Sequence, residues 1–300
     1  MIRFSVSLPQ ADVGPDDVVR FARRAEELGF TGLWVLDSTV GGVTTHTRTF
    51  EGMHVLTFTA AHTSRVRLGI AVLVQSRRNP VLLAKELATI DVLSGGRLTA
   101  GIGLGNDTPE IAGLGFQIER RVRRLTESVE VLRALWRGDA VDFDGELFRF
   151  TGLRVEPKPV QPGGVPIWLG ATAEPAVRRA ARIGDGWIGS GSSPLDGFPE
   201  RVQILRAALG DAGRDPATFP VAKRVYLAIG DDARKRLTPV LDGMYGMDGL
   251  TARAAVCGTA DEVAEKLNWL ADAGADELLL NPLYDHDEHL ERLAEIVRSF

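Results

Sequence analysis

The feature that most constrains this chain is a regular alternation of short apolar runs, rich in β-branched residues, with longer segments of helical spacing. Such alternation is typical of parallel strands that are each covered by a following helix. Eight apolar runs predict strands over residues 2–8, 32–36, 66–73, 97–102, 166–169, 186–190, 221–229 and 277–280. Eight units favour an α/β fold of the (β/α)8 TIM barrel type, with an open doubly wound sheet as the competing fold.

Helical patterns occupy the segments between these runs. They are predicted over residues 16–28, 50–62, 80–93, 121–136, 175–183, 200–212, 260–273 and 286–299. In the first of them Val18, Ala22 and Ala25 share one face, Asp16 suits the positive start of the helix dipole, and Gly29 ends the helix.

The length of 300 residues fits one barrel, which needs about 250 residues, with room for insertions. Two stretches interrupt the alternation, residues 139–164 and 231–257, and are interpreted as insertions after the fourth helix and the seventh strand. Neither has the composition of a flexible linker. Residues 1–300 are therefore expected to form a single domain.

Composition excludes several classes of function. With 44% apolar and 25% charged residues the chain is globular and can bury a large core. The net charge is −5 and the sequence contains no block of Lys and Arg residues, so no nucleic-acid partner is expected. A single cysteine, Cys257, and the lack of a signal sequence or a long apolar run predict a cytoplasmic protein without a membrane partner. The five histidines lack metal-site spacing, so no metal is expected.

Two features mark the ends of predicted strands. Gly101, Gly103 and Gly105 resemble the start of a dinucleotide motif, but Asn106 stands where that motif has its last glycine, so we interpret them as places where a ligand approaches the backbone. Asp37 closes the second apolar run and would lie at the carboxyl-end rim, where barrel enzymes place their sites. Bracing a loop is the alternative role for Asp37.

A turn of small residues follows the fifth strand. Gly170, Ala171 and Thr172 lead into a helix that opens at Pro175. Free backbone amides and the dipole at such a start favour a phosphate group, although Glu174 is an unfavourable neighbour for an anion. A plain strand-to-helix turn is the alternative.

Taken together, these segments resemble the luciferase-like oxidoreductases nearly end to end. The resemblance is carried by residues 63–73 and 79–98 and by shorter blocks at 101–105, 166–171, 184–187 and 258–263. Asp37, after Trp34-Val35-Leu36, looks like the signature of the branch that uses the deazaflavin coenzyme F420, and the layout is similar to that of methylenetetrahydromethanopterin reductase.

The resemblance implies an enzyme that transfers hydride between coenzyme F420 and a small organic substrate such as an imine, enone, carbonyl or alcohol. An FMN-dependent monooxygenase is the alternative, and a barrel that only carries or senses a cofactor is a third. It also implies a bulge with a cis peptide between Ala71 and Val72, and a homodimer. The cofactor-binding residues it implies are Asp37, Ala71, Val72, Gly105, Asn106, Gly170, Ala171, Thr172, Pro175 and Ala176.

The chain departs from the family at the catalytic positions. Where related sugar-phosphate dehydrogenases have a histidine after the aspartate this chain has Ser38, and where they have a glutamate it has Asn106. Ser38 and Asn106 are therefore predicted to polarise the acceptor rather than to deliver a proton. Water, Asp107 or His46 remain as proton sources.

Overall fold

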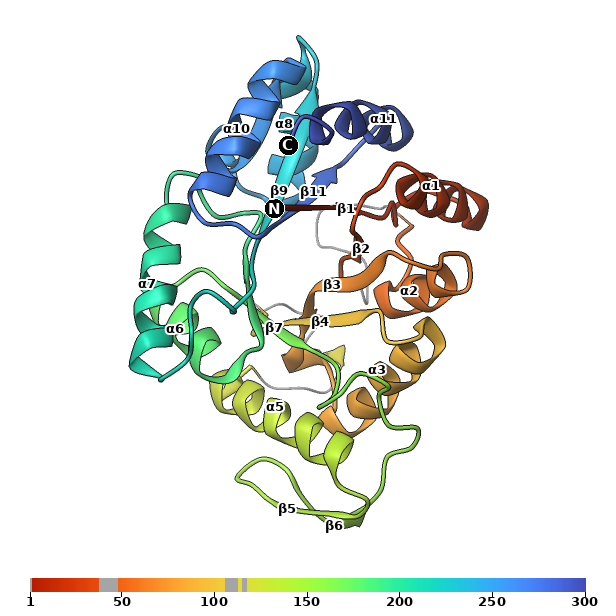
Figure 1. Cartoon of the computed structure of the whole chain (residues 1–300), viewed down its shortest axis with the longest axis vertical. Helices are drawn as coiled ribbons and strands as arrows, with labels where there is room; N and C mark the ends of the chain where they lie inside the picture. Colours follow the sequence, from red (N-terminus) through yellow and green to blue (C-terminus); the bar gives the residue numbers. More distant parts are fainter. Residues whose placement is uncertain (1, 38–47, 106–112, 115–117) are drawn as a thin grey trace.

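The computed structural model describes residues 2–37, 48–105, 113–114 and 118–300. Within these residues eight parallel strands form a closed barrel in the order β1-β2-β3-β4-β7-β8-β9-β11 (Figure 1). Pairing of β8 with β9 and of β11 with β1 closes the sheet, which confirms the TIM barrel and excludes the open sheet. The barrel strands are β1 (Arg3–Ser7), β2 (Gly32–Val35), β3 (Arg67–Val74), β4 (Leu98–Gly103), β7 (Ile167–Ala171), β8 (Gly186–Gly189), β9 (Val221–Ile229) and β11 (Glu277–Pro282).

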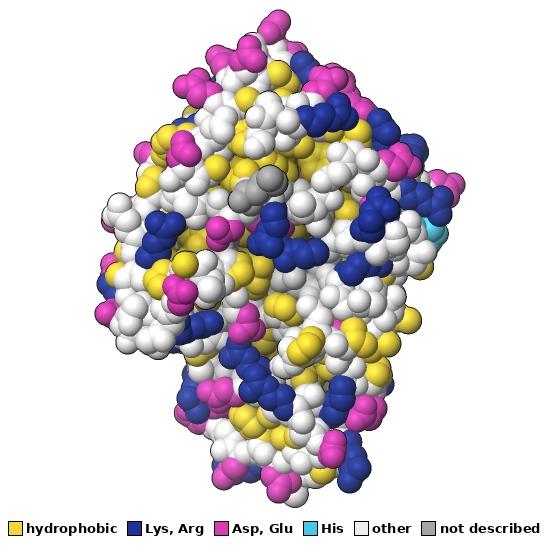
Figure 2. Space-filling view, viewed as in Figure 1, with side chains coloured by type: hydrophobic (Ala, Val, Ile, Leu, Met, Phe, Trp, Pro, Cys, Tyr) yellow, Lys and Arg dark blue, Asp and Glu magenta, His cyan; other side chains and the backbone are white. Residues whose placement is uncertain are grey.

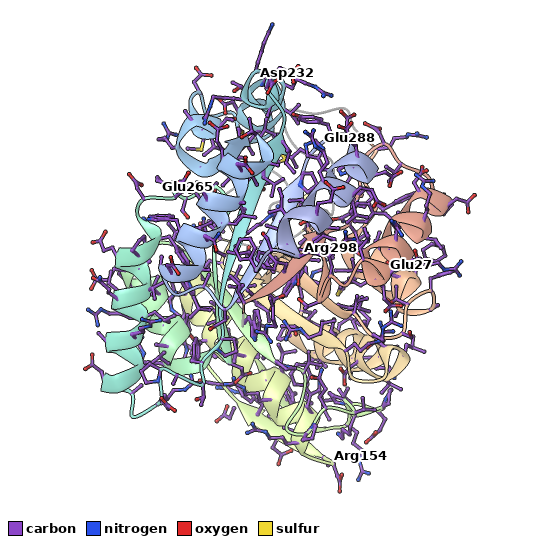
Figure 3. The ribbon with its side chains drawn as sticks, turned by 45° about the horizontal axis from the view of Figure 1, so that its top comes forward. Glu27, Arg154, Asp232, Glu265, Glu288 and Arg298 are labelled. Carbon is purple, nitrogen blue, oxygen red and sulfur yellow. The ribbon has the colours of Figure 1, made fainter. Side chains whose placement is uncertain are left out.

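Helices surround the strands as an outer ring (Figure 1). They are α1 (Pro15–Glu27), α2 (Gly52–Ala60), α3 (Pro80–Ser94), α5 (Arg121–Arg137), α6 (Glu174–Ile183), α7 (Phe198–Asp211), α10 (Ala260–Asp272) and α11 (His286–Val297). A single 3-10 turn, η1 (Gln75–Arg77), joins β3 to α3. Charged side chains such as Glu27 and Glu265 lie on the outside of this ring (Figure 3). Basic and acidic side chains are interspersed on the face shown in Figure 2.

Both predicted insertions contain secondary structure. The first forms an antiparallel hairpin of β5 (Val141–Asp144) and β6 (Arg149–Leu153), which lies outside the helical ring (Figure 1). The second contains α8 (Ala233–Tyr245), α9 (Leu250–Ala254) and the strand β10 (Ala255–Gly258). Because β9 is longer than β8, its last four residues pair with β10 instead, an additional strand that the sequence did not predict.

Local signals in the sequence explain where helices begin and end. Asn79 caps α3 through its side-chain oxygen, which accepts a hydrogen bond from the amide of Val81 at 2.9 Å. Pro80 occupies the first helical turn, and Gly95 ends the helix in the left-handed conformation with φ of 68°. This helix follows the β3 segment that carries much of the candidate site. Within the described residues, no helix is long and apolar enough to span a membrane.

Two indole rings fill the middle of the barrel. Trp34 from β2 and Trp168 from β7 lie with ring centroids 5.7 Å apart and are almost fully buried. Two glycines make room for them: a Cβ on Gly69 would lie 2.3 Å from the Trp34 ring, and one on Gly186 would lie 2.6 Å from Trp168. The barrel is thus a packed core below its rim.

The amino end of the barrel is closed by a buried charge cluster. Glu277 is fully buried, and its carboxylate accepts hydrogen bonds from the Ser5 hydroxyl at 2.6 Å and the Trp34 indole at 3.2 Å. The guanidinium groups of Arg67 and Arg3 also contact it. Each oxygen of Glu277 therefore has charged or polar partners from the chain itself.

Candidate functional site at the carboxyl end of the barrel

The strand order brings most of the predicted site residues to one end of the barrel. β2, β3, β4 and β7 are adjacent, and the predicted contacts at Asp37, Gly105 and Gly170 lie at or beyond the carboxyl ends of their strands. Ala71 lies in the carboxyl half of β3. Ser38 and Asn106, the predicted catalytic residues, lie outside the described residues, as do His46 and Asp107.

Strand β3 carries the predicted bulge. Its pairing with β4 shifts register between Ile70 and Leu73, and the peptide bond between Ala71 and Val72 is cis, which confirms that expectation. Ala71 is 6% exposed and belongs to the apolar cluster inside the barrel with Trp34 and Trp168. Val72 packs against the same cluster.

The glycines after residue 100 are explained by this bulged strand. A Cβ on Gly101 would lie 2.1 Å from the Ile70 carbonyl oxygen, and one on Gly103 would lie 2.7 Å from a methyl group of Val72. Gly105 has a φ of 74°, and a Cβ on it would likewise lie too close to a methyl group of Val74. Within the chain itself, these glycines make room for the β3 strand, and the approach of a ligand to them stays a prediction.

Gly170 supports the bulge from the other side. A Cβ there would lie 2.7 Å from the second methyl group of Val72. The Val72 side chain thus sits between the Cα atoms of Gly103 and Gly170, on neighbouring strands β4 and β7. This packing fixes an apolar platform at the rim of the barrel.

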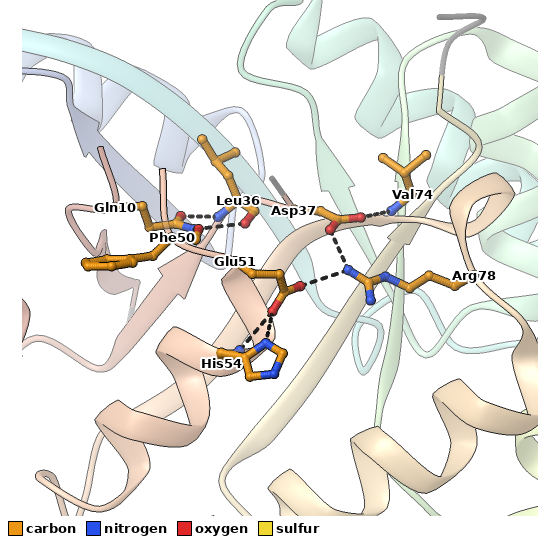
Figure 4. A network of polar contacts seen from close by, with 8 residues as sticks. All are labelled: Gln10, Leu36, Asp37, Phe50, Glu51, His54, Val74 and Arg78. Atoms are coloured by element: carbon orange, nitrogen blue, oxygen red, sulfur yellow. Dashed lines mark hydrogen bonds and ion pairs between the residues drawn. The ribbon is translucent and has the colours of Figure 1, made fainter. Parts of the chain in front are cut away.

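Asp37 is held in a polar network (Figure 4). Its Oδ2 accepts a hydrogen bond from the Val74 amide at 2.8 Å, and its Oδ1 accepts one from Arg78 at 2.7 Å. The side chain is only 1% exposed. Arg78 also binds Glu51 at 2.9 Å, and Glu51 caps α2 through the His54 amide. In this structure Asp37 braces the end of β3, the alternative role that the sequence left open.

Electrostatics reinforce this bracing network. Burial acts to lower the pKa of Arg78, but the carboxylates of Asp37 and Glu51 outweigh it and raise that pKa above its usual value. Burial acts to raise the pKa of Glu51, but hydrogen bonds from His54 and Arg78 outweigh it and lower that pKa. The neighbouring Glu86 carboxyl has a raised pKa because burial dominates there. The charges of Glu51 and Arg78 are thus stabilised by their partners.

Gln10 was not singled out from the sequence. Its amide nitrogen donates to the carbonyls of Leu36 and Phe50, both at 3.1 Å, and its carbonyl accepts from the Leu36 amide at 2.6 Å (Figure 4). One side chain thereby ties together the segments on both sides of residues 38–47. Nothing in the local sequence marks this role, because all partners are distant backbone groups.

The turn after β7 has free hydrogen-bond donors. Within the described residues no group accepts from the amides of Thr172 and Ala173. The amide of Ala176 donates to the Ala173 carbonyl at 2.9 Å, and Pro175 has no amide hydrogen. Of the positions that the sequence suggested, Thr172 thus has an available donor, and Ala173 beside it adds a second.

Two arginines adjust the charge around this turn. Glu174, the unfavourable neighbour, is paired with Arg178 at 2.8 Å. Arg201 from α7 donates through Nε to the Thr172 carbonyl at 2.9 Å, so its guanidinium adjoins the turn. Arg201 was missed because 29 residues separate it from its partner.

A pocket opens on the opposite part of the rim. It has a volume of about 340 Å³ and is bordered by β1, β2, β9 and β11. Ser7, Tyr226, Asn281 and His286 line it, and the hydroxyl groups of Tyr226 and Tyr245 are 2.8 Å apart. Burial lowers the pKa of His286, and the neighbouring His289 lowers it further. Tyr226 and Asn281 were not singled out from the sequence.

Comparison with known proteins agrees with this arrangement. The family model described as luciferase-like monooxygenase matches residues 1–247. The chain belongs to this family. An F420-dependent glucose-6-phosphate dehydrogenase from Nocardia farcinica is 36% identical, covering 93% of this chain and 91% of that protein. A 5,10-methylenetetrahydromethanopterin reductase from Archaeoglobus fulgidus is 32% identical over 72% of this chain, and the match spans only 61% of the reductase.

A solved structure has the same fold. An F420-dependent secondary alcohol dehydrogenase in complex with an F420-acetone adduct superimposes with a TM-score of 0.89 and covers 99% of this chain and 98% of its own. Its sequence identity is 19%, so this likeness concerns the fold.

Proposed function

We propose that this protein is an F420-dependent oxidoreductase that transfers hydride between the deazaflavin and a small organic substrate, namely an imine, enone, carbonyl or alcohol. The named relatives from Nocardia and Archaeoglobus support the cofactor. The observation that carries the proposal is the placement of an apolar platform at Val72 beside a turn with free amides at Thr172 and Ala173. An FMN-dependent monooxygenase remains the alternative, because the family is described by that activity.

The residues present fit a planar cofactor that carries a phosphate. Free amides at a helix start, together with the helix dipole, provide a seat for an anion. Pairing of Glu174 with Arg178 removes the nearest repulsion, and Arg201 adds positive charge. Val72, wedged between Gly103 and Gly170, provides a flat apolar surface on the neighbouring strands. We assign the phosphate to the turn of Gly170, Ala171 and Thr172, with the amides of Thr172 and Ala173 as its donors, and the ring to the surface formed by Ala71 and Val72.

When bound, F420 supplies a carbon centre that gives or accepts hydride. The chain's own contribution is positioning, which can supply about 7 to 11 kcal/mol of a barrier. Asp37 and Arg78 hold the end of β3 through the Val74 amide and so keep the platform in place. We assign Ser38 and Asn106 to polarising the acceptor, and Gly105 and Asn106 to flanking the cofactor.

The test is a titration of the purified protein with F420 and, separately, with FMN. Trp34 and Trp168 lie inside the barrel, so intrinsic fluorescence reports occupancy of the rim. We expect saturable binding of F420 and oxidation of reduced F420 by a panel of imines, enones and carbonyls. Binding of FMN alone, with oxygen uptake by the reduced flavin, would establish the alternative instead. Binding of F420 without turnover of any electrophile would indicate a protein that only carries or senses the cofactor.

One substitution isolates the phosphate seat. Ala173 has φ of −71°, which proline adopts without strain, so Ala173→Pro removes one amide donor and little else. Loss of a hydrogen bond to a charged group costs about 1.5 to 3 kcal/mol, so F420 should bind at least tenfold more weakly. Affinity for a deazaflavin nucleoside without phosphate is the control and should not change. Equal weakening of both ligands would place the phosphate elsewhere.

The remaining expectations are proposals of the same kind. We propose a homodimer in the cytoplasm, with residues 1–300 acting as one domain. Leu82 and Leu93 on α3 are 59% and 61% exposed and stand three helical turns apart on the same side, which supports a contact there. Sedimentation of the protein as a monomer would contradict the dimer.

A further inference from the structure

Arg224 on β9 has no role in the cofactor binding and hydride transfer proposed above. It alternates with Ala222 and Tyr226, so its side chain enters the barrel, and it is 6% exposed. β9 and β3 lie on opposite sides of the eight-stranded ring. The Arg224 side chain crosses the interior, and its Nη1 donates to the Ala71 carbonyl at 2.8 Å.

Two nitrogens of this guanidinium have no hydrogen-bond partner among the described residues. They are Nε and Nη2 of Arg224, and both are buried. Its other contact is the Tyr226 ring, whose centroid lies 4.9 Å from the guanidinium carbon. A buried charge with one neutral hydrogen bond is costly, and proteins normally pair such a group.

The two unpartnered nitrogens define the shape of the missing group. Nε–H and Nη2–H lie on the same edge of the planar guanidinium and point in parallel, which matches the two oxygens of a carboxylate. The neighbouring Asn281, 4% exposed, also has an unpartnered amide nitrogen and lines the 340 Å³ pocket beside Tyr226. In the β9–β11 register Asn281 pairs with Tyr226, which lies two residues after Arg224 on β9.

We propose that Arg224 and Asn281 bind a carboxylate group of the substrate, so that the electrophile reduced by this enzyme is an organic acid. The inference rests on the proposed function, because the platform at Ala71 and Val72 would carry the ring that faces this substrate. Arg224 contacts the Ala71 carbonyl, so its guanidinium adjoins the strand that carries the platform, and a carboxylate bound to it would lie beside Ala71. The rest of the substrate would occupy the pocket lined by Ser7 and His286.

The test uses the full-length protein without cofactor. Acetate, propionate and benzoate are titrated against their neutral amides, with tryptophan fluorescence and the melting temperature as readouts. We expect each carboxylate to bind at least tenfold more tightly than its amide and to raise the melting temperature. Arg224→Met should abolish this preference. Arg224→Lys keeps the charge but not the paired donors, and should lose most of it. The matched control is Arg214→Met, because Arg214 also binds backbone carbonyls, of Ala181 and Gly184, but lies away from the pocket.

A second titration separates this site from the cofactor site. F420 should bind wild type and Arg224→Met with affinities within about threefold of each other. If F420 affinity falls while carboxylates show no preference, Arg224 serves the cofactor and the proposal is overturned. If F420 does not bind wild type but the carboxylate preference is present, the proposed function fails and the anion site stands. No preference in wild type overturns the proposal, and should the Met variant not fold, the Lys variant decides it.

Discussion

The packing of Val72 between two glycines predicts a specific energetic coupling. Gly103→Ala places a Cβ 2.7 Å from a Val72 methyl group, closer than non-bonded carbons approach, so the platform must shift. Overpacking of this kind costs about 1 to 3 kcal/mol. Val72→Ala alone removes two half-buried methyl groups and should cost about 1 kcal/mol. In the double variant the nearest atom to the new methyl group is the Cβ of residue 72, at an ordinary 3.7 Å.

The expected result is a coupling of about 1 to 2 kcal/mol, in which the double variant is more stable than the sum of the single changes predicts. Urea denaturation measures it, and F420 affinity measures the displacement of the platform. Gly210→Ala is the control: Gly210 lies in α7, no atom approaches its Cβ position, and alanine there should stabilise by up to about 1 kcal/mol. Additive effects of Gly103→Ala and Val72→Ala on the free energy of unfolding would refute the wedge described above.

Two further predictions concern buried charges. Lys223 is fully buried, and burial above all, with repulsion from Arg201 and Arg224, lowers its pKa to about 7. An unfolded lysine titrates near 10.4, so the unfolded state binds more protons between about pH 7 and 10, and the free energy of unfolding should rise by about 3 kcal/mol across that window. Lys223→Met should lack this rise in denaturation curves taken at each pH, and parallel curves for the two proteins would contradict the assignment. Glu277→Gln leaves Arg67 without its counter-charge and should lower the free energy of unfolding by about 3 kcal/mol. Adding Arg67→Met should restore part of this stability. A double variant as unstable as Glu277→Gln alone would show that the unpaired Arg67 does not cause the loss.

The barrel itself could be predicted from the sequence because each of its strands is a buried run with its own signature. All eight predicted runs overlap the observed barrel strands, with ends that differ by at most two residues. β10 was missed because Ala255–Gly258 is short and gains its strand character only by pairing with the far half of β9. The sequence predicts that β9 is longer than β8, but it does not show which segment pairs with the part of β9 that extends past β8.

The elements around the candidate site could be predicted from the sequence, but the contacts between them could not. Asp37, the bulge and the turn after β7 were located through their strand ends and through family resemblance. Their partners could not be located: the contact of Asp37 with Arg78 spans 41 residues and that of Arg224 with Ala71 spans 153. For the glycines after residue 100, the sequence shows where a Cβ is missing but not that the β3 strand approaches there.

The buried charged groups at the two ends of the barrel differ in how many partners the chain provides, and this difference bears on the substrate. At the amino end Glu277 has two arginines, a hydroxyl and an indole from the chain itself. At the carboxyl end Arg224 has one carbonyl, although it is nearly as deeply buried. An incomplete shell around a buried guanidinium costs free energy that the chain could have avoided with one acidic residue, which supports our proposal that a substrate group is the missing partner. A substrate carboxylate would complete this shell only when the site is filled, so the same charge that destabilises the empty barrel would favour organic acids over neutral electrophiles.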